Sequence, residues 1–201
     1  MQGLLRSMSI LMVIVVVTLV TAVAKRMYDR KVAVNQIQEV NGTMGFGYFK
    51  PEFLRQLVDD EECCRVPLRV SLGPIANDKA ELDDEILASV SDALQSFNLM
   101  RTLDIRESAI TDKSANVLAS LTQVSNLRLS DTKISDITIQ RLKELPQLRS
   151  LRINGTAVTD ACVDDLAAME NLTRLYLQET QLSEESILEL SKKLPRCKIQ
   201  F

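Results

Sequence analysis

Residues 124–136 read VSNLRLSDTKISD, and residues 148–160 read LRSLRINGTAVTD. The two stretches lie 24 residues apart and carry apolar, polar and acidic residues at matching positions. The same pattern begins at Met100 and again at Leu172, so four units follow one another without an insertion. Agreement at this many positions in four units predicts a protein built from stacked repeats.

Each unit is predicted to contain a short strand, a turn and a helix. The strand carries apolar residues at its first, fourth and sixth positions, as in Leu148, Leu151 and Ile153. After the turn comes a Ser or Thr suited to cap a helix, and then an acid that suits the positive end of the helix dipole. These pairs are Thr111-Asp112, Ser135-Asp136, Thr159-Asp160 and Ser183-Glu184. One unit cannot bury its own apolar side, so stacked units should share a continuous core.

The turn of each unit carries one further hydroxyl residue. Ser108, Thr132, Thr156 and Thr180 share this position, and we expect their hydroxyls to bond to backbone groups of the turn. Beyond the fourth unit, Cys197, Ile199 and Phe201 alternate with polar residues. This alternation predicts a terminal strand that covers the open edge of the last repeat.

The chain ahead of the repeats is less regular. Residues 67–72 alternate as a strand does, and residues 82–97 have the apolar spacing of a helix, so 67–99 should form a degenerate first repeat that caps the array. Upstream, Asn41-Gly42 indicates a helix stop or turn, residues 43–49 suggest a strand, and Pro51 suits a short helix. The expected organisation is a hydrophobic segment at 1–25, a helix and strand segment at 26–66, the cap at 67–99 and the repeats at 100–201.

Residues 8–24, MSILMVIVVVTLVTAVA, carry no charge. A membrane-spanning helix needs roughly 17–25 apolar residues, so this run is at the short end of that range. Ala22-Val23-Ala24 also fits a signal-peptide cleavage site, which would export the repeats. We favour an uncleaved single-pass anchor, because Lys25, Arg26, Arg30 and Lys31 follow directly and the run exceeds a usual signal core. By the positive-inside rule these cations place the repeat domain in the cytoplasm.

The composition excludes several classes of function. The chain has no His and a net charge of −3, which argues against His-dependent catalysis, His–metal sites and nucleic-acid binding. The cysteines Cys63, Cys64, Cys162 and Cys197 fit no zinc spacing and are interpreted as packing residues. The acidic run 59–62 lacks the alternating ligands of a calcium loop. We therefore expect no enzyme activity, no metal, no cofactor and no small-molecule substrate.

These repeats follow the leucine-rich-repeat pattern, with Thr where the general motif has Asn or Cys. Asn41-Gly42-Thr43, the Thr-containing repeats and the tail Leu194-Pro195-Arg196-Cys197-Lys198-Ile199 resemble bacterial membrane-anchored leucine-rich-repeat proteins. The resemblance implies an α/β solenoid with short parallel strands on the concave face, helices on the convex face and an N-terminal transmembrane helix. It also implies a binding function.

A partner is expected on the concave face, because residues between the buried Leu positions point outward along a strand. The column between the two buried positions reads Asp104, Arg128, Arg152, Tyr176. Arg suits bidentate contacts with carboxylates or phosphates, and Arg and Tyr are favoured at binding hot spots. The candidate partner-binding residues are Arg101, Asp104, Arg106, Arg128, Arg149, Arg152, Arg174 and Tyr176.

The sequence thus predicts a membrane-tethered module that binds an acidic or phosphorylated protein partner. Two alternatives remain: a structural envelope protein with no specific ligand, and an exported solenoid released by signal-peptide cleavage.

Overall fold

The structure, a computed structural model, describes residues 18, 21–22, 25–48, 65–72 and 82–201. Most of the 8–24 run, the helix expected at Pro51, the acidic run 59–62 and the pair Cys63 and Cys64 lie outside these residues. Within the described part of the chain, no helix is both long enough and apolar enough to cross a membrane.

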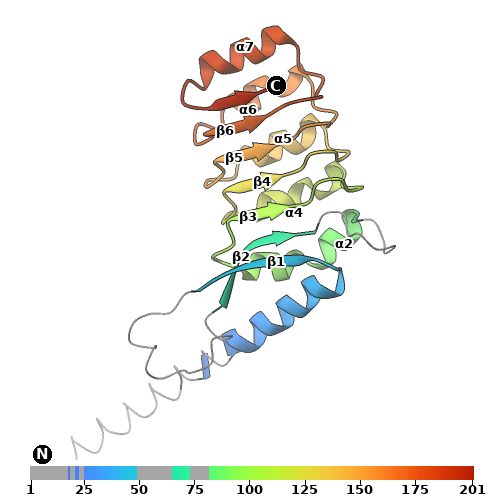
Figure 1. The fold of residues 1–201 in the computed structure, drawn as a ribbon, viewed down its shortest axis with the longest axis vertical. Coiled ribbons are helices and arrows are strands. Elements are labelled where there is room, and N and C mark those ends of the chain that lie inside the picture. The colour runs from blue at the N-terminus through green and yellow to red at the C-terminus, as the bar shows by residue number, and fades with distance from the viewer. Residues whose placement is uncertain (1–17, 19–20, 23–24, 49–64, 73–81) are drawn as a thin grey trace, which may run out of the picture.

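Seven strands form one sheet, and their order in space follows their order in the chain (Figure 1). They are β1 (Thr43–Tyr48), β2 (Arg65–Ser71), β3 (Thr102–Asp104), β4 (Asn126–Arg128), β5 (Ser150–Arg152), β6 (Arg174–Tyr176) and β7 (Lys198–Gln200). β1 and β2 are antiparallel, whereas every later pair is parallel. From β3 onward, paired residues are 24 positions apart, as in Leu127 and Leu151. The parallel α/β solenoid expected from the repeats is therefore confirmed.

Helices cover one face of this sheet (Figure 1). They are α2 (Asp84–Ser89), α3 (Ser91–Ser96), η3 (Asp112–Ser114), α4 (Ala115–Ser120), α5 (Asp136–Leu142), η4 (Asp160–Cys162), α6 (Val163–Ala167) and α7 (Glu184–Lys193). The single helix predicted over residues 82–97 is wrong, because the chain breaks at Val90 into α2 and α3. Leu87, Val90 and Leu94 are all buried on either side of this break.

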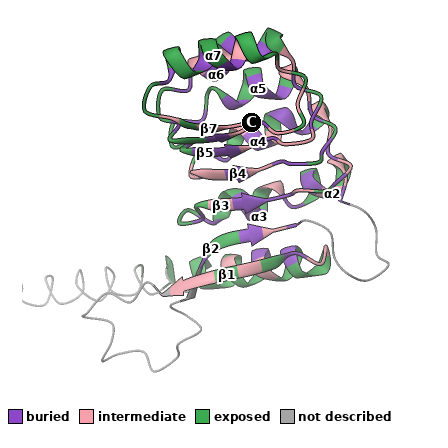
Figure 2. Cartoon of the chain, turned by 45° about the horizontal axis from the view of Figure 1, so that its top comes forward, coloured by how far each residue is buried: buried purple, intermediate pink, exposed green. Residues whose placement is uncertain are grey.

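The core runs from the helix of residues 25–39 to α7, and buried residues recur in every unit (Figure 2). The strand residues Leu103, Leu127, Leu151 and Leu175 are each at most 1% exposed. The turn hydroxyls have the structural role expected of them. Each donates to the carbonyl oxygen three residues earlier, as Thr132 Oγ1 does to Leu129 at 2.7 Å.

The predicted N-caps are confirmed. The aspartates that follow them also accept hydrogen bonds from the next unit. Thr111, Ser135, Thr159 and Ser183 each accept a hydrogen bond from a backbone N–H of their own helix. The acid of one unit also binds the N-cap residue of the next unit. Asp136, for example, accepts from Thr159 N at 2.8 Å and from Thr159 Oγ1 at 2.6 Å. We call Asp84, Asp112, Asp136 and Asp160 the cap ladder, because all four make this contact.

At the front of the array, the helix of residues 25–39 buries Ala33 and Ile37. It stops at Asn41, whose φ of 59° is left-handed, and Gly42 N then donates to Ile37 O at 2.7 Å. A Cβ on Gly42 would lie 2.5 Å from Ile37 Cγ2, so the stop requires glycine.

At the other end, β7 pairs with β6 along its full length. Cys197 and Ile199 are half-buried against the last repeat. The expected packing of Phe201 is wrong, since the strand ends at Gln200 and Phe201 is 69% exposed.

Candidate partner-binding surface

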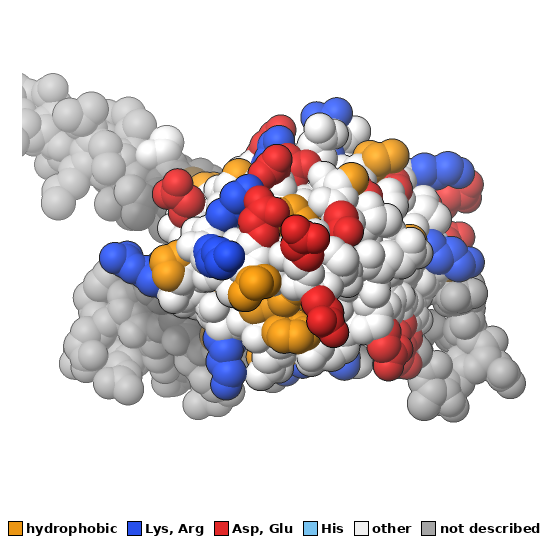
Figure 3. All heavy atoms as spheres, turned by 90° about the horizontal axis from the view of Figure 1, so that it is seen from above, with side chains coloured by type: hydrophobic (Ala, Val, Ile, Leu, Met, Phe, Trp, Pro, Cys, Tyr) orange, Lys and Arg blue, Asp and Glu red, His pale blue; other side chains and the backbone are white. Residues whose placement is uncertain are grey.

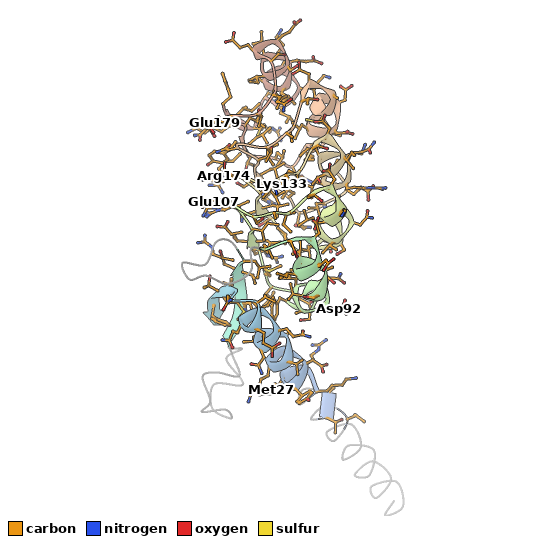
Figure 4. All side chains as sticks on the ribbon, turned by 90° about the vertical axis from the view of Figure 1, so that its right-hand side faces the viewer. Met27, Asp92, Glu107, Lys133, Arg174 and Glu179 are labelled. Carbon is orange, nitrogen blue, oxygen red and sulfur yellow. The ribbon has the colours of Figure 1, made fainter. Side chains whose placement is uncertain are left out.

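The short strands β3 to β7 present a face of the array that no helix of the described residues covers (Figure 4). The register stacks Asp104, Arg128, Arg152 and Tyr176 in one column, as the sequence predicts. Gln200 of β7 continues this column. Arg174, Glu107 and Glu179 also lie on this side of the molecule, whereas Asp92 lies on the helix side (Figure 4).

In the first part of this column, Asp104 forms ion pairs with neighbouring arginines. Asp104 was expected to point outward for a partner, but it is only 5% exposed. Its carboxylate accepts from Arg106 Nε at 2.8 Å and from Arg128 Nη1 at 3.1 Å. Burial raises the pKa of Asp104, but the hydrogen bonds and charges of Arg106 and Arg128 outweigh it and hold the pKa below its ordinary value. Asp104 is therefore an internal ligand that holds two arginines in place.

The second part of the column is open. The guanidinium carbon of Arg152 lies 4.0 Å from the centre of the Tyr176 ring, a cation–π contact. A shallow hollow of about 600 Å³ adjoins this pair. Its lining is formed by Asp131, Arg152, Asn154, Tyr176, Gln178, Glu179 and Gln200. Gln178 Oε1 is buried there and, among the described residues, has no hydrogen-bond partner.

The two edges of the face carry opposite charge. Arg101, Arg149 and Arg174 are exposed where the strands begin, and we call them the basic edge. Arg101 donates to the carbonyl of Gln123 at 3.0 Å, and none of the three forms an ion pair within the described chain. Glu107, Asp131 and Glu179 are exposed just past the strand ends, and we call them the acidic edge.

The acidic edge also carries an unusual backbone. Glu107, Asp131 and Glu179 have φ values of 53°, 58° and 57°, in the left-handed region that favours glycine. Gly155 has the equivalent place in the third repeat, with φ of 62°. Repeat periodicity alone could have revealed this column, because the only glycine of the four repeats stands in it.

Of the eight predicted site residues, the structure thus places Asp104, Arg106 and Arg128 in one internal cluster. Arg152 and Tyr176 form a second pair, and Arg101, Arg149 and Arg174 form the basic edge. The hollow adds Asn154, Gln178, Asp131, Glu179 and Gln200 to the face. The sequence does not point to Gln200, because the terminal strand is predicted only to cover the open edge of the last repeat.

Two cysteines fall within the described residues, and both are free thiols. Cys162 is fully buried in the core, and burial raises its pKa well above the ordinary range, with the nearby Asp136 adding to the effect. Cys197 is half-buried, and burial likewise raises its pKa. Within the described chain, no group of three or more acids or cysteines could hold a metal ion.

No protein-family model matches the chain, and no curated protein matches it. Several solved structures resemble it at low sequence identity. A leucine-rich-repeat protein of Leptospira interrogans is 18% identical, with a TM-score of 0.42 over 65% of this chain and 36% of that one. An internalin of Listeria monocytogenes is 18% identical, with a TM-score of 0.43 over 66% and 46%. A second Listeria monocytogenes protein, internalin C2, is 17% identical, with a TM-score of 0.34 over 62% and 76%.

The chain therefore spans less than half the length of the first two structures. The fold itself is shown by the parallel strand register, in which paired residues lie 24 positions apart.

Proposed function

We propose that the chain is a membrane-tethered, non-catalytic module that binds a protein partner on the face formed by β3 to β6. The observation that carries this proposal is the basic edge, where three arginines stand exposed and without ion pairs in the described chain. Arginine binds carboxylates and phosphates through two parallel hydrogen bonds. Acidic or phosphorylated groups of the partner therefore lie over the beginnings of the strands.

The acidic edge refines the chemistry of the partner. A segment that runs along the strands meets Arg149 or Arg174 at one end and Asp131 or Glu179 at the other. Such a segment needs an acidic group followed, across the width of the face, by a cationic one. Complementary charges of this kind set orientation and partner choice more than raw affinity.

The tether is inferred from the sequence of residues 8–24 and the cations that follow it. We propose a single-pass anchor with the repeats in the cytoplasm. Fractionation tests this: the anchored protein sediments with membranes in high salt and is released by detergent. A soluble product that begins at Lys25 would instead show cleavage and export.

Binding is tested by capture from membrane extract with the full chain in mild detergent. The variant Arg149→Glu/Arg174→Glu is expected to lose the captured partner. The control Lys113→Glu/Arg141→Glu makes the same change in net charge at exposed residues of η3 and α5 and should keep it. Loss in the control together with retention in the edge variant would place the partner on the helix side and refute the proposal.

A further inference from the structure

The last helix and strand of the described chain, α7 and β7, form one surface of the array. β7 is the last strand of the sheet, with β6 as its only neighbour in the described chain, so its outer edge has no partner strand. Leu188 of α7 is 58% exposed and Phe201 is 69% exposed. Figure 3 views the molecule from this end and shows apolar side chains near the middle with acidic and basic ones around them. An apolar centre with a charged rim is the usual anatomy of a protein interface.

The contacts of α7 decide which way Leu188 faces. Lys193 Nζ lies 2.7 Å from Asp164 Oδ1 of α6, so that flank of α7 faces the preceding repeat. At 3.6 residues per turn, Leu188 lies about 140° and Glu184 about 180° around the helix from Lys193. Ile187, Leu190 and Leu194 are buried toward the sheet. Leu188 and Glu184 therefore face away from the preceding repeat.

The charges on this flank are self-complementary under a two-fold rotation. Glu184, Leu188 and Lys192 are spaced four residues apart and form one stripe along α7. An antiparallel copy of the same helix places Leu188 against Leu188 and each Glu184 against Lys192 of the other copy. All three side chains are exposed, and within the described chain neither Glu184 nor Lys192 forms an ion pair.

We propose that this end surface is a homodimer interface, in which two copies meet end to end through α7 and β7. A two-fold axis along the line from sheet to helices makes both pairs antiparallel at once: α7 against α7 and β7 beside β7. The interface is isologous, so it closes at two copies and does not grow into a fibre. The paired edges would remove an open strand that otherwise invites uncontrolled association.

The test is the mass of the full chain in mild detergent, measured by light scattering with the detergent contribution subtracted. The wild type is expected at the mass of two chains and Leu188→Glu at the mass of one. Ile137→Glu is the matched control, because Ile137 is 59% exposed on α5 in the middle of the array, and it should remain a dimer. Circular dichroism melts of each variant confirm that the fold is retained.

A charge swap sharpens the result. Glu184→Lys alone and Lys192→Glu alone each place like charges together and should shift the protein toward one chain. The double variant Glu184→Lys/Lys192→Glu restores opposite charges and should return the mass to two chains. A wild type of one-chain mass, a dimer that survives Leu188→Glu, or a double variant that stays at one chain would each overturn the proposal.

Discussion

Two columns of side chains run along this array, and they differ in chemistry. The cap ladder has Asp in the first capping unit and in the first three repeats, and each carboxylate binds the N-cap residue of the next unit. The column Asp104, Arg128, Arg152 and Tyr176 changes its residue type along the sheet and does not repeat one contact. Repeated chemistry joins neighbouring units, whereas varied chemistry on a rigid sheet is free to serve a partner. The cap ladder therefore contributes to stability, and the varied column lies on the face where we propose that a partner binds.

The largest expected effect comes from the core beneath both columns. Leu151→Asp should unfold the array, because Leu151 is fully buried and in register between Leu127 and Leu175. An unpaired buried carboxylate costs on the order of several kcal/mol, against a total stability of roughly 5–15 kcal/mol. Circular dichroism melts measure the loss.

The neighbouring residue is the control for that experiment. Arg152→Asp places the same carboxylate one position along β5 but on the open face, so its melt should remain close to wild type. An unchanged melt for Leu151→Asp would mean that Leu151 is not in the core.

A smaller loss is expected when the cap ladder is broken. Asp112 accepts hydrogen bonds from the backbone N–H and hydroxyl of both Ser135 and Thr138. Asp112→Ala removes these contacts between two units and should cost about 1.5–3 kcal/mol, the range for hydrogen bonds to a charged group. Glu185→Ala is the control, since Glu185 also lies in the first turn of its helix, is exposed and accepts no such bond within the described chain. If both variants lose the same free energy of unfolding, the contacts between units contribute nothing beyond the effect of an acid at the start of a helix.

The same carboxylate predicts a dependence on pH. Burial raises the pKa of Asp112, but the hydrogen bonds from Ser135 and Thr138 outweigh it and lower the pKa below its ordinary value. A lowered pKa in the folded state means that the stabilisation is present above the unfolded pKa, about 3.9, and is lost as the pH falls through the folded pKa. The difference in melting temperature between wild type and Asp112→Ala should therefore be constant near pH 7 and shrink below about pH 4. A difference that stays constant down to pH 2 would contradict this origin.

The sequence predicted the repeat, its strand register and its N-caps, because these depend on spacing within one unit. The cap ladder was not predicted, because Asp112 and Ser135 come into contact only when two units stack. The sequence within one unit does not indicate that contact. Asp104 was misassigned for a related reason. Alternation along a strand predicts which side a residue faces, but not that Arg106 and Arg128 would cover it. The break at Val90 interrupts apolar spacing that suits one continuous helix, so the pattern gives no sign of it.

The acidic edge allows a test of whether an acidic residue at a strained backbone position lowers stability but supports binding. Glu179 holds a left-handed backbone, so Glu179→Gly should stabilise the protein by about 0.5–1 kcal/mol. Gly155→Ala should do the reverse, because its φ of 62° is strained for any residue with a Cβ. Chemical denaturation measures both. If Glu179→Gly gains stability and loses the partner, the acid is retained for binding; if it loses stability, the backbone argument is wrong.

The smallest effect is expected within the varied column itself. The contact of Arg152 with Tyr176 at 4.0 Å lies on the surface, where cation–π pairs contribute about 0.5–1 kcal/mol. A double-mutant cycle with Arg152→Ala, Tyr176→Ala and the double variant isolates this coupling in denaturation experiments. The same cycle measured on partner capture should give a larger coupling than the one for stability, because a partner that desolvates the pair strengthens the attraction of cation and ring. Arg128→Ala with Tyr176→Ala is the control, since these residues lie two strands apart and should show additive effects. Additive effects of Arg152 and Tyr176 on capture would mean that they do not act as one site, and the second half of the column would then resemble the cap ladder in serving the fold alone.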